Sequence, residues 1–144
     1  MRLCADMLSE YLREELSSVR MFSSKPVLLI PVPLHPLRHR ERGFNQIESV
    51  LNHLPQEFHD GRLSRIESGA LVRVRETKPQ THLGRMERMS NVKGAFAVSD
   101  HTTVLSAHVI LIDDVMTTGA TLAEAGRPLA NLGVSVSLLA LARA

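Results

Sequence analysis

The residues most suited to chemistry follow one another in a single stretch near the end of the chain. The acidic pair Asp113 and Asp114 comes directly after the apolar run Val109–Ile112. Behind the pair stand residues rich in hydroxyl groups around one glycine: Val115, Met116, Thr117, Thr118, Gly119, Ala120 and Thr121. Backbone N–H groups at the start of a helix bind phosphate, and carboxylates can accept hydrogen bonds from sugar hydroxyls beside it. The stretch therefore predicts a sugar-phosphate site, with the acidic pair on the sugar and residues 115–121 around the phosphate.

Each of these residues also has an ordinary structural explanation. Thr117 alone could cap a helix, and two aspartates could simply be solvated at the end of a strand. Capping does not need two carboxylates and three threonines together, so the stretch as a whole favours a ligand site. Two other phosphate motifs are absent from the sequence: no lysine follows Gly119 as in a Walker A loop, and no G-x-G-x-x-G occurs.

Apolar spacing predicts the elements that must position this stretch. Helices are expected over residues 3–19, 44–54 and from 119 to just before 133, and strands over 27–32, 70–74, 95–98, 109–113 and 134–141. Residues 76–92 show no period and are expected to form a functional lid or a disordered loop, and Pro128 is expected to kink the last helix. The order of these elements predicts an α/β domain on a mostly parallel sheet, with ligands at the carboxyl ends of its strands.

Length and composition describe one ordinary globular domain. The chain has 144 residues, 44% of them hydrophobic and 22% charged, which predicts a single unit with residues 1–26 as helix and linker and residues 27–144 as core. No apolar run approaches the roughly 20 residues of a membrane span, and no secretory signal follows Met1, so a cytoplasmic protein without membrane contact is expected. Cys4 is the single cysteine and none of the seven histidines stands in a ligand motif, so no protein-bound metal is expected.

Charge is distributed unevenly along the chain. Between Arg38 and Lys93 there are 11 basic and 7 acidic residues, although the net charge of the whole chain is only +2. A basic face there could meet the phosphates of a small molecule or of nucleic acid, or could simply be solvated. With no Trp, one Tyr and four Phe, the sequence offers few stacking platforms, which disfavours a dedicated nucleic-acid module.

The stretch from Val109 to Thr121 resembles the phosphoribosyl pyrophosphate (PRPP) signature of type I phosphoribosyltransferases. Two further segments are similar to the ComF/GntX branch of that family. They are Pro31-Val-Pro33-Leu with Arg42-Gly-Phe-Asn-Gln46, and Arg75-x-Thr77-x-x-Gln80-x-x-Leu83-x-x-x-x-Arg88-x-x-Asn91-x-x-x-Ala95-Phe96. The resemblance covers the chain from about residue 27 to its end and implies a type I phosphoribosyltransferase-like fold.

The resemblance implies a reaction and assigns residues to it. The protein would bind PRPP with Mg²⁺ held mainly by the ligand, and would transfer ribose 5-phosphate to a nitrogen nucleophile with release of pyrophosphate. Asp113 and Asp114 would be catalytic, residues 115–121 would bind the 5'-phosphate, and Arg38, Arg40 and Arg42 would bind pyrophosphate through their guanidinium groups. The flexible loop from Glu76 to Asn91 would close over the site, and the residues assigned to it are Arg75, Thr77, Lys78, Gln80, Arg85 and Arg88.

The sequence also departs from the family in ways that support an alternative. Relatives usually carry a cysteine-rich, zinc-ribbon-like segment before the transferase domain, and the hood that selects the acceptor is minimal here, so the nucleophile is not defined. The alternative is a non-catalytic PRPP-binding protein or a DNA-uptake accessory of the ComF family, with nucleic acid as a partner. A homodimer is among the expected assemblies under both hypotheses.

Overall fold

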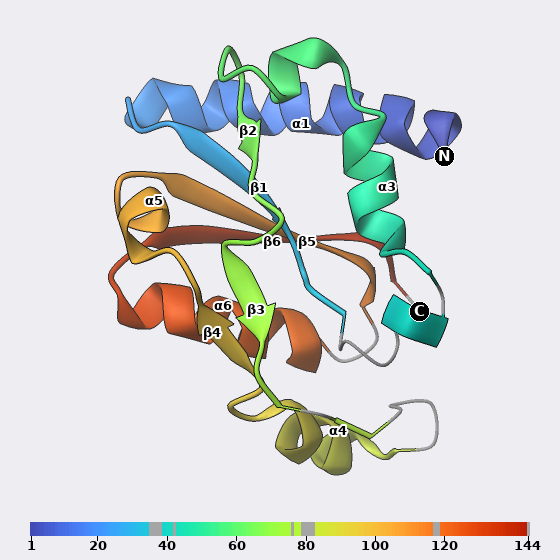
Figure 1. Ribbon diagram of the computed structural model, residues 1–144. Helices are drawn as coiled ribbons and strands as arrows, with labels where there is room; N and C mark the ends of the chain where they lie inside the picture. The colour runs from blue at the N-terminus through green and yellow to red at the C-terminus, as the bar shows by residue number, and fades with distance from the viewer. Residues whose placement is uncertain (35–38, 42, 76, 79–82, 117–118, 144) are drawn as a thin grey trace.

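A computed structural model describes residues 1–34, 39–41, 43–75, 77–78, 83–116 and 119–143. Its elements, in chain order, are α1 (Arg2–Phe22), β1 (Val27–Pro31), α3 (Gln46–Asn52), the 3-10 turn η1 (Gln56–Phe58), β2 (Arg65–Ile66), β3 (Leu71–Arg73), α4 (Arg85–Val92), β4 (Phe96–Val98), α5 (His101–Leu105), β5 (His108–Met116), α6 (Ala120–Asn131) and β6 (Ser135–Arg143). Figure 1 shows these elements as a sheet with helices on both sides.

The centre of the protein is a four-stranded sheet in the order β2-β1-β5-β6, and every neighbouring pair in it is parallel. β1 pairs with β5 from Val27 opposite His108 to Pro31 opposite Ile112. Because parallel strands all begin at one edge and end at the other, the sheet has an amino edge and a carboxyl edge (Figure 1). The expected α/β fold with a mostly parallel central sheet is confirmed.

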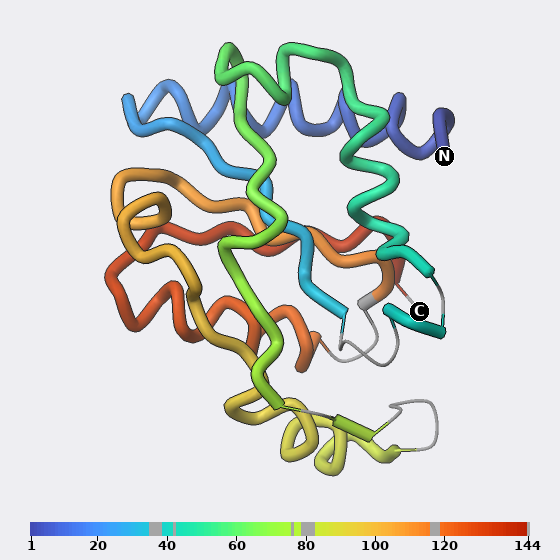
Figure 2. Tube along the Cα trace, in the orientation of Figure 1, coloured from blue at the N-terminus to red at the C-terminus, as the bar shows by residue number. Residues whose placement is uncertain are grey.

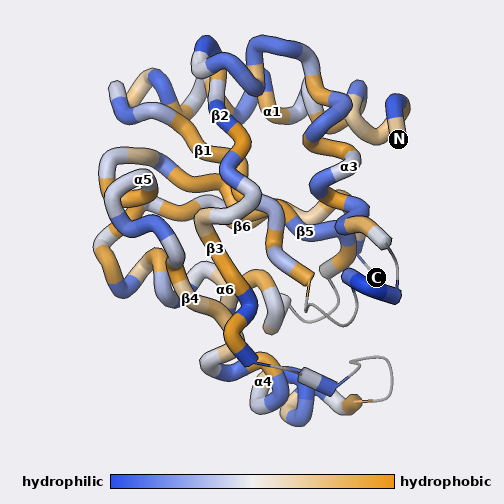
Figure 3. Tube along the Cα trace, in the orientation of Figure 1, coloured by the Kyte–Doolittle hydropathy of each residue, from blue (hydrophilic) through white to orange (hydrophobic). Residues whose placement is uncertain are grey.

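Alternate side chains of the central strand β5 enter two different cores. Ile110 and Ile112 pack in a cluster with α1 and α3, whose members include Leu12, Leu16 and Leu51. On the other face, Val109 and Leu111 pack in a cluster that includes α5, α6 and the strands β3 and β4. Burial on both faces explains why this strand is continuously apolar, and Figure 3 shows the sheet strands as the hydrophobic interior.

The strands expected at 70–74 and 95–98 form but lie outside the central sheet. β3 and β4 pair only with each other, antiparallel, with Leu71 opposite Val98 and Arg73 opposite Phe96. Together with α4 they form an arm, made of the described residues between 71 and 98, and Figure 2 shows α4 at the end of this arm that is far from the sheet.

The expectation that residues 76–92 have no regular structure is wrong for its second half, because α4 occupies Arg85–Val92. This helix buries only Val92, while Met86 and Met89 are exposed; these three apolar residues are spaced three apart, but over eight residues they are too few for the spacing to stand out as a helical period. Residues 76 and 79–82 of the expected loop lie outside the described residues.

The ends of the other helices and strands lie closer to the positions expected from the sequence. α1 continues to Phe22, and β5 runs through the acidic pair to Met116 instead of ending at Asp113. Pro128 lies inside α6, which nevertheless continues to Asn131. Gly126 of the same helix faces the sheet so closely that a Cβ there would stand 3.3 Å from a methyl of Leu138, which explains why a residue without a side chain occupies that turn.

Candidate functional site

The acidic pair lies at the carboxyl edge, within the last part of β5. Asp113 is opposite Ala140 of β6, and Val32, just beyond β1, donates its N–H to the carbonyl of Ile112 at 2.9 Å. Neighbouring strands therefore hold the backbone on both sides of the pair. Each carboxylate also binds the chain itself: Asp113 Oδ1 accepts from the N–H of Asp114 at 2.9 Å, and Asp114 Oδ1 accepts from the N–H of Val115 at 2.8 Å.

The two carboxylates differ in their electrostatic environment. Burial raises the pKa of Asp113 to about 7, and the neighbouring charge of Asp114 also raises it. The hydrogen bond from the Asp114 N–H and the positive charge of Arg73 act in the opposite direction. Asp113 is therefore divided between its acid and carboxylate forms near neutral pH, so it can donate or accept a hydrogen bond from a ligand hydroxyl.

The helix behind the pair begins as the sequence predicts. Gly119 is its N-cap with φ of +79°, in the left-handed region that glycine enters without strain, and α6 starts at Ala120. The carbonyl of Gly119 accepts the N–H of Ala123 at 2.9 Å, which closes the first turn, and Thr121 is half-buried in that turn. The positive end of the α6 dipole thus follows the carboxylates along the chain. Val115 is exposed, Met116 ends β5, and Thr117 and Thr118 lie outside the described residues.

The segment after β1 is tied to the sheet by one buried polar residue. The Asn45 side chain donates from Nδ2 to the carbonyl of Val32 at 3.1 Å and accepts the N–H of Ile47 at 3.0 Å, which caps α3. Asn45 therefore ties the start of α3 to the residue that follows β1, beside the carboxyl edge. Arg40 is exposed there, whereas Arg38 and Arg42 lie outside the described residues.

Most described loop residues taken from the resemblance hold the arm together instead of joining the acidic pair. One terminal nitrogen of Arg75 donates to the carbonyls of Asn91 and Lys93, at 2.6 and 2.5 Å. The backbone of Lys78 exchanges two hydrogen bonds with the Asn91 side chain. Arg85 and Arg88 belong to the first half of α4, and Gln80 lies outside the described residues.

Arg73, in β3 at the base of the arm, is marked by no motif of the sequence, yet its positive charge acts on Asp113. Its guanidinium lies 5.0 Å from the centre of the Phe96 ring and donates to Thr77 Oγ1 at 3.1 Å, and its charge acts on Asp113. Thr77 therefore supports Arg73 at the base of the arm. Forty residues separate Arg73 from the acidic pair in sequence, and no local pattern signals their proximity.

In the described part of the chain, no three His, Cys, Asp or Glu side chains come together as a metal-binding group. None of the helices described has the length and apolar character needed to cross a bilayer.

The chain is similar to proteins named for DNA utilization and for competence. It is 36% identical over 110 residues to the DNA utilization protein YhgH of Escherichia coli, which covers 76% of this chain and 46% of that protein. It is 36% identical over 121 residues to competence protein F of Haemophilus influenzae, covering 83% and 51% of the two chains. Competence protein ComFC of Streptococcus pneumoniae is 28% identical over 131 residues, covering 91% and 52%.

The chain thus spans about half the length of the curated relatives it matches. It matches no model of a known protein family.

Proposed function

We propose that this chain, whose relatives support the ComF family, is a PRPP-binding accessory domain for DNA uptake or DNA use. One observation carries the proposal: the half-buried Asp113 and Asp114 lie in the last part of the central strand, and only residues 115–118 separate them in sequence from the left-handed Gly119 and the start of α6. Carboxylates for a sugar and a helix start for a phosphate are thus adjacent at one edge of the sheet. The DNA-related part of the proposal comes from the relatives' names.

Each group at the carboxyl edge has a part in holding this ligand. The backbone N–H groups at the start of α6 would bind the 5'-phosphate, and the acidic pair would bind the ribose hydroxyls. The buried side of Asp113 favours a neutral partner such as a hydroxyl over a second anion, because an additional negative charge there would raise the cost of its own ionisation. Arg40, on the exposed segment after β1, would face the pyrophosphate.

The donor set at this edge fits Mg²⁺ bound together with the ligand. Both aspartates use Oδ1 for a backbone N–H, and each retains a second carboxylate oxygen, the hard donor that Mg²⁺ prefers. When bound, Mg²⁺ would neutralise charge on the pyrophosphate. Asp113 and Asp114 would hold it through water or the ligand, since Mg²⁺ keeps several waters and phosphate oxygens when protein donors are few.

Phosphoribosyl transfer is a second candidate, favoured by the position of Arg73. Arg73 lies at the base of the arm and its charge acts on Asp113, so the arm, which would cover the ligand, starts within electrostatic range of the acidic pair. Covering matters because the transfer breaks the bond from the anomeric carbon to pyrophosphate, which leaves with the electron pair, and forms a bond to nitrogen. Exclusion of water protects the cationic sugar between these events.

Calorimetry tests the binding proposal. PRPP with Mg²⁺ is expected to bind more tightly than ribose 5-phosphate with Mg²⁺, and EDTA is expected to remove most of the difference. No heat with PRPP would contradict the proposal. A screen for pyrophosphate release with bases, ammonia and glutamine then separates enzyme from binder: release with one of them supports transfer, and binding without release supports the accessory function.

A further inference from the structure

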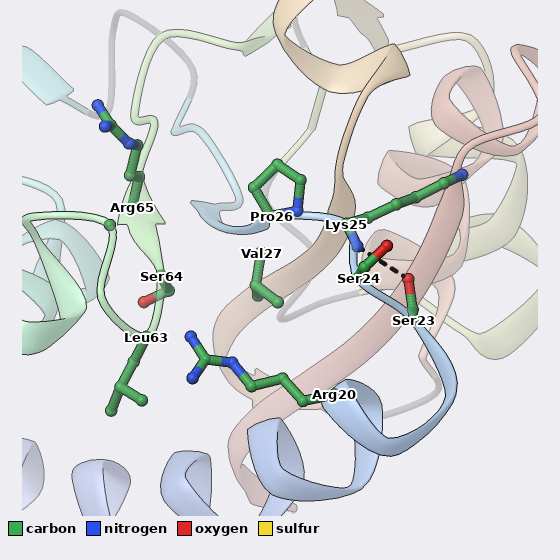
Figure 4. Close-up of a pocket in the computed structure, with 10 residues that line it drawn as sticks. Arg20, Ser23, Ser24, Lys25, Pro26, Val27, Leu63, Ser64 and Arg65 are labelled. Carbon is green, nitrogen blue, oxygen red and sulfur yellow. Dashed lines mark hydrogen bonds between the residues drawn. The ribbon is translucent and has the colours of Figure 1, made fainter.

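A pocket lies at the amino edge of the sheet, at the opposite end of β1 from the edge that carries the acidic pair. Its volume is about 450 Å³, and it is formed where α1 ends, β1 begins and the chain turns into β2. Its lining combines cations and serine hydroxyls with apolar residues, and includes Arg20, Ser23, Lys25, Ser64 and Arg65 around Val27. Figure 4 shows these side chains around the start of β1.

The pocket has an excess of positive charge. Arg20, Lys25 and Arg65 come from three different segments, and none of them forms an ion pair with a carboxylate of the described chain. The carboxylate of the neighbouring turn, Asp60, is already engaged by Arg62, through the Arg62 N–H at 2.9 Å and its Nε at 2.8 Å. The Asp60 carboxylate therefore offsets the positive charge of Arg62, and it is not paired with the three cations that line the pocket.

Local backbone structure fixes where these cations stand. Arg20 reaches across the pocket toward Leu63 and Ser64, and its guanidinium donates to the carbonyl of Arg62 (Figure 4). Arg65 lies against the turn at Gly61, where φ is +90° and a Cβ would stand 3.1 Å from Arg65 Nε. At the other side, the backbone N–H of Lys25 donates to Ser23 Oγ at 3.2 Å.

The charged ends of the three side chains point in different directions, and their arrangement favours an extended ligand over a compact one. In Figure 4 the ends of Lys25 and Arg65 extend to opposite sides of the start of β1, and the guanidinium of Arg20 lies below Val27, on a third side. One small anion could not meet all three, whereas a chain of linked phosphates crossing the pocket could meet one cation after another. No aromatic residue lines the pocket, so recognition would depend on the phosphates and not on stacked bases.

We propose that the amino-edge pocket binds a chain of linked phosphates, with Lys25, Arg20 and Arg65 contacting successive groups. A single nucleic-acid strand and inorganic polyphosphate share this chemistry. This proposal rests on the DNA-related part of the proposed function, and for that reason a nucleic-acid strand is the first probe. The proposal does not require PRPP to bind at the carboxyl edge.

The test measures fluorescence anisotropy of a labelled single-stranded oligothymidylate over a salt series. Three phosphate contacts predict a slope of log affinity against log salt of about −2, since each contributes about 0.7 on single strands. The double variant Lys25→Gln with Arg65→Gln is expected to lower the slope to about −0.7 and the low-salt affinity at least about tenfold. Both side chains are exposed, and Lys25 lies outside every helix and strand, so Lys25→Gln alone is a second variant with about half the effect on the slope.

The matched control is Arg2→Gln with Lys93→Gln, which removes one Arg and one Lys from exposed positions outside the pocket. It is expected to bind the strand like the unmodified protein. Equal weakening in the control would overturn the proposal, because net charge would then explain the binding. Absence of strand binding by the unmodified protein at low salt would also overturn it.

Two competitors complete the experiment. Inorganic polyphosphate is expected to displace the strand, and its affinity relative to that of the strand identifies the preferred source of linked phosphates. PRPP with Mg²⁺ is expected to leave the strand bound, and displacement would place the strand at the carboxyl edge and contradict the proposal. Calorimetry with PRPP on the Lys25 and Arg65 double variant keeps the two proposals apart, since its PRPP affinity is expected to be unchanged.

Discussion

The two edges of one parallel sheet carry opposite chemistry. At the carboxyl edge, two carboxylates lie half-buried on the central strand, and burial holds one of them near its titration point at neutral pH. At the amino edge, cations from separate segments surround an open pocket and remain exposed at Lys25 and Arg65. From His108 to Asp113 the strand advances five residues, about 16 Å, twice the Debye length of about 8 Å at physiological salt. Ligands at the two edges can therefore be tested almost independently.

The largest effect is expected from removing both charges at the carboxyl edge. Asp113→Asn with Asp114→Asn retains the Oδ1 acceptors for the backbone N–H groups, so the fold should persist. Loss of two charge-assisted contacts, each about 1.5–3 kcal/mol, predicts at least a hundredfold loss of PRPP affinity by calorimetry.

The control for this variant is Asp6→Asn with Glu10→Gln, which removes two acidic charges from exposed positions on α1. It should bind PRPP normally. The acidic-pair variant should bind the oligothymidylate at the amino edge as tightly as the unmodified protein. Unchanged PRPP affinity without the acidic pair would refute the assignment of the sugar site.

Features encoded in neighbouring residues could be predicted, and features assembled from distant ones could not. The strand Val109–Ile112, the acidic pair and the glycine before α6 follow one another in sequence, so composition and order alone placed them together at a strand end. The Asp113 neighbour Arg73 and the amino-edge pocket depend on which strands adjoin, which the apolar pattern does not determine. The same reason explains why β3 and β4 could be expected as strands but not as a separate sheet.

The second prediction concerns the pH dependence of stability. The folded-state pKa of Asp113, about 7, lies above its ordinary value of 3.8, so folding favours the protonated form. Stability should therefore fall as pH rises from about 4 to about 7, and the penalty should be complete above that. Asp113→Asn removes the penalty, and we expect it to be more stable than the unmodified protein by roughly 2–4 kcal/mol at pH 8.

Urea denaturation at several pH values measures this difference. At about pH 4 the two proteins should have similar free energies of unfolding, because both then carry a neutral side chain at position 113. Asp60→Asn is the comparison at an exposed acid whose pKa is lowered chiefly by the Arg62 backbone N–H, and its stability difference should have the opposite sign. A pH-independent gain in Asp113→Asn would mean that Asp113 is ionised at little cost in the folded protein.

The third prediction concerns the three arginines after β1 that are assigned to pyrophosphate. If Arg38, Arg40 and Arg42 bind pyrophosphate, replacing Arg40 by Gln should weaken the binding of PRPP by about 1.5–3 kcal/mol. The affinity for ribose 5-phosphate should be nearly unchanged, because this ligand lacks the pyrophosphate. The same comparison applies to Arg38→Gln and Arg42→Gln. Paired calorimetric titrations give the selectivity between the two ligands. Equal weakening of both would reject the pyrophosphate role, and loss of strand binding alone would assign the arginines to nucleic acid.

The smallest effect is expected at His108, the first residue of β5. Its ring lies between two hydroxyls, with Nδ1 2.9 Å from Ser135 Oγ and Nε2 3.0 Å from Ser137 Oγ. Burial lowers its pKa, and the positive charge of Lys25 lowers it further. The imidazole therefore reports on charge at the amino edge without itself lining the pocket.

Titration of the His108 ring resonances by NMR uses this reporter, with a His108→Gln variant to assign the signals among the seven histidines. Lys25→Gln should raise the pKa of His108 slightly, because a nearby positive charge that disfavours the imidazolium is gone. Phosphates bound across the pocket should raise it more, since their negative charge favours the imidazolium. PRPP with Mg²⁺ at the carboxyl edge should leave it unchanged, because solvent and salt screen charge over that distance. A strand that binds without moving the pKa of His108 must lie somewhere other than the amino edge.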